Sequence, residues 1–400
     1  MIIERKEYIE KIKPFINKHI IKVLIGVRRS GKSTILKQII DSLINDGINE
    51  ENIVWINFEL SDYFGIDNIE KLEDYISQKT ENLEGQIYLF FDEIQVIPMW
   101  EKLINSYFAK ERYDIFITGS NSKLLSGEFA SYLSGRYVEI NVYPFSFKEY
   151  VQYFNIESDF KKHFLTYLEV GGMVSTYEYQ DDSRELVMGD LYNSIVLKDI
   201  IQRNNIKNVD LLDRLIRYIM YNISQTFSAN KVYNRLKQDM VNLSVNTIYN
   251  YMKYFENACL VHQVKREDLK GKQILKHDEK YYICDLGFRQ AIIGHNQRDI
   301  TRVLENIVYL ELLRKGYEVS IGKVDDLEID FVCKKQSQII YVQVSYIIES
   351  EKTREREFAP FHKISDNYPK YLITMDDIDM SDNGYKHLNI IDFLLGRYEL

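Results

Sequence analysis

Short runs of apolar residues alternate with amphipathic stretches along the first 145 residues. The apolar runs are nearly continuous, which is typical of parallel strands buried on both faces, and they predict strands at Val23–Ile25, Ile53–Phe58, Ile87–Phe91, Ile115–Thr118 and Tyr137–Asn141. The stretches between them predict helices near Lys32–Ile44, Ile69–Asn82, Trp100–Ala109 and Ser122–Ser134. This alternation predicts an α/β fold with a parallel sheet.

Beyond Phe147 the apolar residues recur with a helical period. Leu186–Ile201 and Val209–Ile223 carry apolar residues three and four positions apart, which predicts amphipathic helices. After a helix near residue 300, we expect strands near Tyr317–Ile321, Glu328–Cys333 and Ile339–Ser345. The chain therefore divides into four expected segments: an α/β core over 1–146, a helical lid over 147–225, a small unit over 226–290 and a second α/β domain over 300–400.

Composition and charge restrict the class of protein. Apolar residues make up 45% of the chain and charged residues 28%, which is ordinary for folded domains and argues against long disordered tracts. The formal net charge of −9 argues against a polyanion-binding surface over the whole chain, but not against local basic patches. The cysteines form no CxxC pair, the amino-terminal residues resemble no signal peptide, and no apolar run spans a bilayer. We therefore expect a reduced, cytoplasmic protein without membrane contact.

One segment matches the phosphate-binding loop GxxxxGK[ST] in full. It follows the apolar run Lys22–Ile25 and opens a helix, which is the context that the motif requires. Lys32 would reach the β- and γ-phosphates of ATP, and the Ser33 hydroxyl would ligate Mg²⁺. The residues expected to bind ATP are Gly26, Arg28, Arg29, Ser30, Gly31, Lys32, Ser33 and Thr34. A chance match in a turn is the alternative.

Two carboxylates, Asp92 and Glu93, follow the apolar run Ile87–Phe91. They would stand at the carboxyl end of a buried strand, where ligands bind in open α/β sheets. We expect Asp92 to hold Mg²⁺, directly or through water, and Glu93 to act as general base toward the attacking water. An acidic strand end in a loop is the alternative, and the nearby phosphate loop makes it the weaker one.

Polar residues also follow the next strand, which ends at Thr118. Asn121 or Ser120, with Thr118 as a weaker candidate, could contact the γ-phosphate or the attacking water. Ser120 or Ser122 would equally suit the N-cap of the following helix, and the two interpretations are compatible.

Arg136 lies at the end of a predicted helix, just before the last strand of the core. An arginine in this position can reach the nucleotide of a neighbouring subunit and neutralise charge in the transition state. A surface arginine favoured by the helix dipole is the alternative, and Arg112 is a weaker candidate for the same role.

These segments together resemble a known family. The sequences GVRRSGKST, YLFFDEIQ, ITGSNSKLLS and LSGRYVEINVYPFSFKEY are similar to those of the predicted AAA+ ATPases of archaea and bacteria. The resemblance continues through YLEVGGM, SVNTIYNY and YYICDLG and covers nearly the whole chain. It implies a P-loop AAA+ fold, Mg-ATP as cofactor, Arg136 as the arginine finger, and a homo-oligomer in the form of a hexameric ring. No second-sensor arginine is evident in the lid.

The unit over 226–290 resembles a winged helix. Ser244 suits an N-cap, and Val245, Ile248, Met252 and Phe255 form the core stripe of the helix that follows. A helix at Asn230–Met240, and a hairpin of Val261–Arg266 and Tyr281–Cys284 with a turn at Gly271, would complete the unit. The residues then expected to face outward, toward DNA bases, are Asn246, Thr247, Asn250 and Lys253.

Charge supports DNA contact by this unit. Residues 226–276 contain nine Lys or Arg and four acidic residues, a local charge of +5, which suits a phosphate backbone. A solvated basic face on a protein-contact module is the alternative.

The last hundred residues resemble the PD-(D/E)XK nuclease fold. A helix with Glu305 and Glu311 and a strand with Asp330 supply acids, but Gln343 and Ser345 stand where Glu and Lys belong. Such a nuclease needs anionic oxygens for Mg²⁺ and a cation beside the hydroxide. Lysines elsewhere could substitute for the missing catalytic lysine, although their spacing does not indicate it: Lys323, Lys334 and Lys335. We expect a domain without nuclease activity, retained for structure or DNA binding.

These observations predict an oligomeric AAA+ ATPase that couples Mg-ATP hydrolysis to action on DNA, with branched or structured DNA suggested by analogy alone. The alternative from another class is a regulatory nucleotide switch, which turns over rarely and presents its winged helix and C-terminal domain to a protein. An ATP-dependent nuclease is a third option, which Gln343 and Ser345 oppose.

Overall fold

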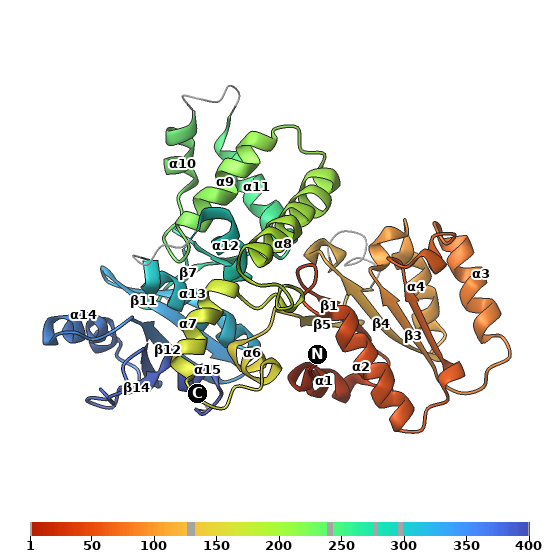
Figure 1. Ribbon diagram of the computed structural model, residues 1–400, viewed down its shortest axis with the longest axis horizontal. Helices are drawn as coiled ribbons and strands as arrows, with labels where there is room; N and C mark the ends of the chain where they lie inside the picture. The colour runs from red at the N-terminus through yellow and green to blue at the C-terminus, as the bar shows by residue number, and fades with distance from the viewer. Residues whose placement is uncertain are drawn as a thin grey trace. The chain divides into compact units, whose positions relative to one another are not determined.

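Two compact units make up the chain, each with its own sheet. The computed structural model describes residues 2–125, 133–237, 243–271, 273–275, 278–294, 299–398 and 400 (Figure 1). The first unit comprises Met1–Tyr143 with Asn257–Cys259, and the second comprises Pro144–Glu256 with Leu260–Leu400.

The sheet of the first unit is entirely parallel, as predicted. Its order is β2-β3-β4-β1-β5, with bounds β1 Ile21–Ile25, β2 Ile53–Asn57, β3 Ile87–Asp92, β4 Tyr113–Gly119 and β5 Tyr137–Asn141. Ile25 of β1 pairs with Gly119 of β4, and Asn57 of β2 pairs with Asp92 of β3. The carboxyl ends of these strands therefore meet at one edge, as parallel pairing requires.

Helices cover both faces of this sheet (Figure 1). On one face, α1 (Lys6–Ile12) and α2 (Lys32–Asn45) pack their apolar residues against Leu24, Phe90 and Phe116. On the other face, α3 (Ile69–Thr80) and α4 (Trp100–Ala109) pack against Val23, Leu89 and Ile117. Burial on both faces explains why the strands are apolar at nearly every position. A 3-10 helix begins the predicted helix Ser122–Ser134 over Ser122–Leu125, while residues 126–132 lie outside the described residues.

The second unit begins with helices, as the helical period predicts. Their bounds are α6 Phe147–Tyr153, α7 Phe160–Val170, α8 Asp181–Ser194, a π-helix Ile195–Gln202, α9 Val209–Tyr221, α10 Ala229–Leu236, α11 Val245–Asn257, α12 Leu286–Ile293 and α13 Ile300–Arg314. The predicted extension of α10 over 238–240 lies outside the described residues. Within the described ranges, no helix is both long and apolar enough to cross a bilayer.

A mixed seven-stranded sheet follows, in the order β14-β13-β12-β11-β10-β7-β8. Its strands are β7 Arg266–Asp268, β8 Gln273–Ile274, β10 Glu318–Val324, β11 Leu327–Lys335, β12 Gln338–Val344, β13 Lys370–Thr374 and β14 Lys386–Asn389. Helices α14 (Glu351–His362) and α15 (Ile390–Leu394) follow β12 and β14. The three strands predicted from apolar runs are β10, β11 and β12.

The hairpin of the winged-helix prediction is correct in part. β6 (Val261–Val264) pairs antiparallel with β9 (Lys280–Ile283), as expected. The Gly271 turn, however, joins β7 to β8, and β7 pairs in parallel with β10 of the seven-stranded sheet. The Asp268 carboxylate accepts the N–H groups of Lys270 and Gly271 and fixes this turn.

Asp285 connects two of the segments that carry the family resemblance, YLEVGGM and YYICDLG, inside the second unit. Its carboxylate accepts the backbone N–H of Gly172 at 2.6 Å and that of Gly287 at 2.8 Å, the second as N-cap of α12. Burial raises the pKa of Asp285 to about 7, and the two N–H donors oppose the rise. The two segments are thus parts of one packed region.

Candidate functional site

The phosphate loop passes from β1 to α2 along a path that requires glycine at two points. A Cβ atom on Gly26 would lie 2.1 Å from the backbone oxygen of Val142, so no side chain fits there. Gly31 has a φ of +97°, which other residues rarely adopt, and α2 begins at Lys32 directly after it. The loop therefore ends at the N-terminus of α2, where the partial positive charge favours an anion.

Lys32 lies folded over this loop. Its ammonium donates to the backbone oxygens of Gly26 at 3.0 Å and Val27 at 3.2 Å, and the residue is 4% exposed. Ser30 is also buried, and its hydroxyl has no hydrogen-bond partner among the described residues. A buried ammonium and an unpaired hydroxyl in one loop fit the oxygens of a phosphate group.

The other predicted ATP-binding residues surround these groups. Arg28 donates to Glu59 at 3.0 Å, while Arg29 is exposed with a φ of 60°. Ser33 and Thr34 lie half-buried in the first turn of α2, and the Ser33 hydroxyl hydrogen-bonds the Asp92 carboxylate. The structure thus brings Ser33 and Asp92, the two residues predicted to hold Mg²⁺, into contact.

Asp92 ends β3 with one of its oxygens unpaired. Its Oδ1 accepts the hydroxyl of Thr118 on β4, and its buried Oδ2 has no hydrogen-bond partner in the described part of the chain. Burial raises the pKa of Asp92, and the hydroxyls of Ser33 and Thr118 oppose this rise. An unpaired buried carboxylate oxygen beside a serine hydroxyl fits Mg²⁺, which prefers oxygen ligands.

Four neighbouring side chains contact Glu93. Its backbone has a φ of 60°, and its N–H donates to Thr118 Oγ1 at 3.0 Å. Its carboxylate accepts the Ser120 hydroxyl at 3.1 Å and the Gln95 side-chain amide, and lies 3.5 Å from the Lys32 ammonium. Burial acts to raise its pKa, but Lys32 and the neighbouring donors hold the pKa below its usual value. The carboxylate is therefore ionised at neutral pH and able to accept a proton.

Of the three polar residues predicted after β4, Ser120 and Thr118 contact the carboxylates. Asn121 is buried beside Ser120, and its backbone oxygen accepts the N–H of Leu124. The 3-10 helix begins at Ser122, directly after Asn121. Sequence analysis missed Gln95, whose only signal is an amide two residues after Glu93. It also ranked Thr118 last, although this side chain contacts both acidic residues.

Arg136 lies at the opposite edge of the sheet from the phosphate loop. It precedes β5, whose first residue, Tyr137, pairs with Ile21 at the start of β1. Because the loop follows Ile25 at the far end of β1, the two are separated by a five-residue strand, about 16 Å long. Arg136 therefore cannot reach the phosphate loop of its own chain.

Both arginines considered for the finger role have local partners. The exposed Arg136 guanidinium donates to Asn105 at 2.5 Å and lies 5.7 Å from the centre of the Phe108 ring. Arg112 donates to the backbone oxygens of Gly85 and Leu83. A side-chain contact on the surface is more easily exchanged than two bonds to backbone oxygens.

The helix predicted to read DNA exposes the predicted face. Ser244 accepts the N–H of Thr247 at 3.1 Å, as an N-cap does, and Ile248, Met252 and Phe255 are buried while Val245 is half-buried. The outward residues are exposed at Asn246, Asn250 and Lys253, and half-buried at Thr247.

The local positive charge is smaller than the sequence suggests. Arg266 pairs with Glu328, and Lys270 pairs with Asp325 at 2.6 Å, so β11 and the turn before it neutralise two of the basic residues. Lys272 and Lys276 lie outside the described residues. What remains is Lys231 and Arg235 on α10, Lys237 at its C-cap, Lys253 on α11, and Lys265 between β6 and β7.

A lysine that sequence analysis missed occupies the acidic cluster of the C-terminal sheet. The Lys280 ammonium on β9 lies 2.9 Å from Glu305, 2.7 Å from Glu328 and 3.9 Å from Asp330. Burial, followed by the charge of Glu305, raises the pKa of Asp330 to about 8. In the described ranges, no group of three or more His, Cys, Asp or Glu side chains is arranged to hold a metal ion.

Two of the three lysines that could have substituted for a catalytic one, Lys334 and Lys335, have partners elsewhere. Lys334 pairs with Glu267 at 2.7 Å, and Lys335 donates to the backbone oxygen of Lys315 at 2.8 Å. Gln343 donates to Glu357 at 3.3 Å and accepts the N–H of Asp330. Lys280 belongs to no nuclease motif, and only the pairing of β9 beside α13 brings it to the acids.

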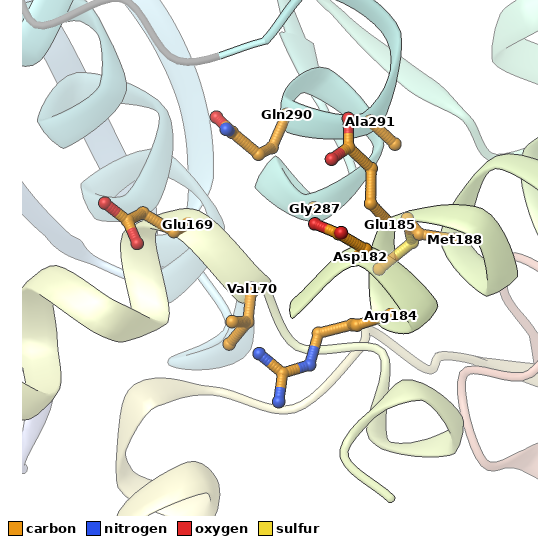
Figure 2. A pocket seen from close by; sticks show the side chains of 9 residues that line it. All are labelled: Glu169, Val170, Asp182, Arg184, Glu185, Met188, Gly287, Gln290 and Ala291. Carbon is orange, nitrogen blue, oxygen red and sulfur yellow. The ribbon is translucent and has the colours of Figure 1, made fainter. Parts of the chain in front are cut away.

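A cavity of about 210 Å³ lies in the second unit, between α7, α8 and α12 (Figure 2). Its polar lining includes Glu169, Asp182 and Glu185, and Arg184 donates to the backbone oxygens of Thr176 and Tyr179. Since carboxylates outnumber cations here, the cavity does not suit a nucleotide phosphate, and the phosphate loop remains the nucleotide-site candidate.

Comparisons with known proteins agree with the first-unit geometry. The AAA domain family matches residues 18–151, and a domain of unknown function (DUF8612) matches residues 161–299. An uncharacterized protein of Haemophilus influenzae is 39% identical over 398 residues, covering 98% of this chain and 99% of that one. An uncharacterized protein of Methanocaldococcus jannaschii is 28% identical, covering 93% and 85%.

Among solved structures, the ORC2 protein of Aeropyrum pernix aligns with a TM-score of 0.37 at 11% identity, covering 76% of this chain and 91% of that one. The family relationship rests on sequence identity and not on this structural alignment, because the identity to the Haemophilus influenzae protein extends through both units. The chain therefore belongs to the family of AAA-domain proteins that includes this Haemophilus influenzae protein.

Proposed function

We propose that the protein is a Mg-ATP hydrolase that acts as a homo-oligomer, a hexameric ring, and couples hydrolysis to action on DNA. The observation that carries the proposal is the meeting of Lys32, Asp92 and Glu93 at one sheet edge, with Lys32 3.5 Å from Glu93. A phosphate-binding cation, a candidate metal ligand and an ionised base are the groups that phosphoryl transfer to water needs.

Each group has one role in this scheme. Lys32 would exchange the backbone oxygens of the loop for the β- and γ-phosphates, and Ser33 and Asp92 would hold Mg²⁺, which would neutralise charge on the phosphates. Glu93 accepts the proton of the attacking water, while Thr118, Ser120 and Gln95 orient its backbone and carboxylate. Asn121 stays a candidate for contact with the water.

The position of Arg136 supports assembly. A finger at the edge opposite to the phosphate loop can act only on the nucleotide of another subunit, where it stabilises transition-state charge. An isolated chain would then hold an incomplete site.

The exposed residues of α11 and the basic residues of α10 and α11 support contact with DNA. A cavity of about 340 Å³ adds arginine and tyrosine side chains from α9 and α10, lined by Arg214, Arg217, Tyr218, Tyr221, Asn222, Val232, Arg235 and Leu236. Arg214 and Arg217 pair with Asp210 and Asp213, so Arg235 is the guanidinium offered to a phosphate here, and the tyrosines can stack on unpaired bases.

The C-terminal sheet, in the same proposal, hydrolyses no DNA. Lys280 supplies a cation where a nuclease of this type would bind Mg²⁺, and Gln343 supplies no charge. The acids are thereby neutralised inside the protein, which suits a structural or DNA-binding role.

Two substitutions in the nucleotide site have different expected effects. Lys32→Ala removes the cation that contacts both phosphates and should abolish ATP binding or hydrolysis. Glu93→Gln keeps the shape and one acceptor oxygen but cannot take up a proton at neutral pH, so it should bind ATP and hydrolyse it at least ~100-fold more slowly, the lower range for losing a general base. Binding of a fluorescent ATP analogue and phosphate release separate the two steps. Glu70→Gln, an exposed acid on α3, is the control, and wild-type turnover in Lys32→Ala would contradict the assignment.

DNA should raise the rate of ATP hydrolysis. Turnover measured with single-stranded, duplex and four-way DNA is expected to increase severalfold with at least one of them, and Lys253→Glu should lose much of the increase because it reverses charge on the exposed face of α11. Lys161→Glu makes the same charge change at an exposed position of α7 and should retain the DNA-dependent increase in turnover. Slow turnover that DNA leaves unchanged, together with nucleotide-dependent assembly, would instead support the regulatory switch.

Mixing two inactive variants tests whether Arg136 acts between subunits. Arg136→Ala should bind nucleotide almost normally and hydrolyse it slowly, because a finger acts mainly on the transition state. Mixed with Glu93→Gln protein, it should recover part of the activity, since some interfaces join an intact Glu93 to an intact Arg136. Recovery should depend on protein concentration. If activity does not recover in mixtures that sizing shows to have exchanged subunits, the intersubunit role is refuted.

Replacing Asp330 should change how stability depends on pH. The folded pKa of about 8 lies above the unfolded value of about 3.8, so the wild-type chain loses stability as the pH rises through this interval. Asp330→Asn cannot ionise at this position. Between pH 5.5 and pH 8.5 its free energy of unfolding, measured in urea, should therefore rise relative to wild type by about 1 kcal/mol or more. Asp326→Asn, an exposed neighbour, is the control. A variant that gains no stability over wild type between pH 5.5 and pH 8.5 would show that Asp330 is already ionised throughout this range, as a metal ligand must be.

A further inference from the structure

Arg5 is the buried cation nearest to the phosphate loop apart from Lys32, and nothing in the motifs assigns it a role. It is 2% exposed and among the largest fully buried side chains. Its Nη1 donates to the backbone oxygen of Ser30 at 2.7 Å, and its Nη2 donates to that of Tyr143 at 3.1 Å. The guanidinium also lies over the Tyr8 ring, 4.4 Å from its centre.

Local hydrogen bonds hold the backbone of Arg5 in place. Its N–H donates to the side-chain oxygen of Gln38 on α2 at 3.0 Å, and the Gln38 amide donates back to the backbone oxygen of Ile3 at 2.8 Å. The Tyr8 hydroxyl accepts the N–H of Tyr143 at 3.1 Å. The amino-terminal segment is therefore hydrogen-bonded to α2, the helix that follows the phosphate loop.

The bond to Ser30 determines which way the next N–H points. In a trans peptide, the C=O of residue 30 and the N–H of residue 31 point in opposite directions. Because Arg5 holds the Ser30 oxygen, the Gly31 N–H is directed away from Arg5. Gly31 has a φ of +97° and directly precedes α2, and successive N–H groups turned inward at such a position form an anion-binding concavity.

Only an arginine meets both requirements of this position. Its planar group presents separate nitrogens to Ser30 and Tyr143, whereas a lysine offers one point charge on a flexible stem. The positive charge also lies directly behind the loop, where it favours an anion in front of it.

We propose that Arg5 is a positioning residue for the phosphate loop: by holding the Ser30 carbonyl it keeps the Gly31 N–H directed toward the phosphates of ATP. The proposal rests on the proposed nucleotide-binding function. Arg5 contacts the loop and not the reacting atoms, so it acts on nucleotide affinity and leaves the chemical step unchanged.

The competing explanation is that Arg5 only anchors α1. An anchor affects the stability of the unit, and the conservative Arg5→Lys should then behave nearly as wild type in nucleotide binding. Tyr8→Phe is the matched control, because it removes the hydroxyl bonded to Tyr143 from the same segment and leaves the Arg5–Ser30 bond in place.

The experiment measures Kd for a fluorescent ATP analogue, KM, kcat and the melting temperature on the full chain. Arg5→Ala and Arg5→Lys are both expected to raise Kd and KM roughly tenfold to hundredfold, which corresponds to one charge-assisted hydrogen bond. At saturating ATP, kcat should change less than about threefold. Tyr8→Phe should lower the melting temperature with Kd unchanged.

Each other outcome has a defined meaning. Wild-type Kd in a folded Arg5→Lys variant, or a kcat loss without a change in KM, overturns the positioning role while the proposed function stands. Should Arg5→Ala fail to fold, Arg5→Lys alone decides between the two explanations. A wild-type chain that binds no ATP analogue would remove the proposed function and this inference together.

Discussion

The parallel pairing of β1, β3 and β4 is the constraint on which the rest of the candidate site depends. Neighbouring parallel strands end at one edge, so the phosphate loop after β1, the acids after β3 and the hydroxyls after β4 converge although they are far apart in sequence. A buried ion pair between Lys22 of β1 and Asp114 of β4 joins two of these strands inside the sheet. Removal of one partner would leave a buried charge unpaired, which the fold tolerates poorly.

The same pairing that assembles one edge separates Arg136 from it. A residue before β5 stands at the amino edge because β5 runs parallel to β1. In the proposed mechanism, this distance is the physical reason for assembly, since the transition-state cation and the base can meet only across two chains. The tightly held Glu93 fits such a scheme, because its three donors keep it ionised and in place before a neighbouring subunit completes the site.

Cations of the chain itself balance the acidic cluster of the C-terminal sheet. Lys280 satisfies two carboxylates within 3 Å, and Arg266 pairs with the second of them. Burial of so many acidic groups would be unfavourable without internal cations or protonation, and here both occur, because Asp330 has a pKa of about 8. Charge balance inside the protein thus accounts for the acidic cluster.

Sequence alone determined the parallel core, the phosphate loop, the acidic strand end and the helix capped by Ser244. Each depends on a local signal: a continuous apolar run, a glycine at a fixed spacing, or a hydroxyl before an apolar period. Tertiary structure decided the roles of Thr118 and Gln95 around Glu93, the placement of Arg5 and Lys280, and the pairing of β7 with β10. These depend on contacts between distant segments. A short strand or a single charged side chain carries no signal of its partner, and only the path of the whole chain brings the two together.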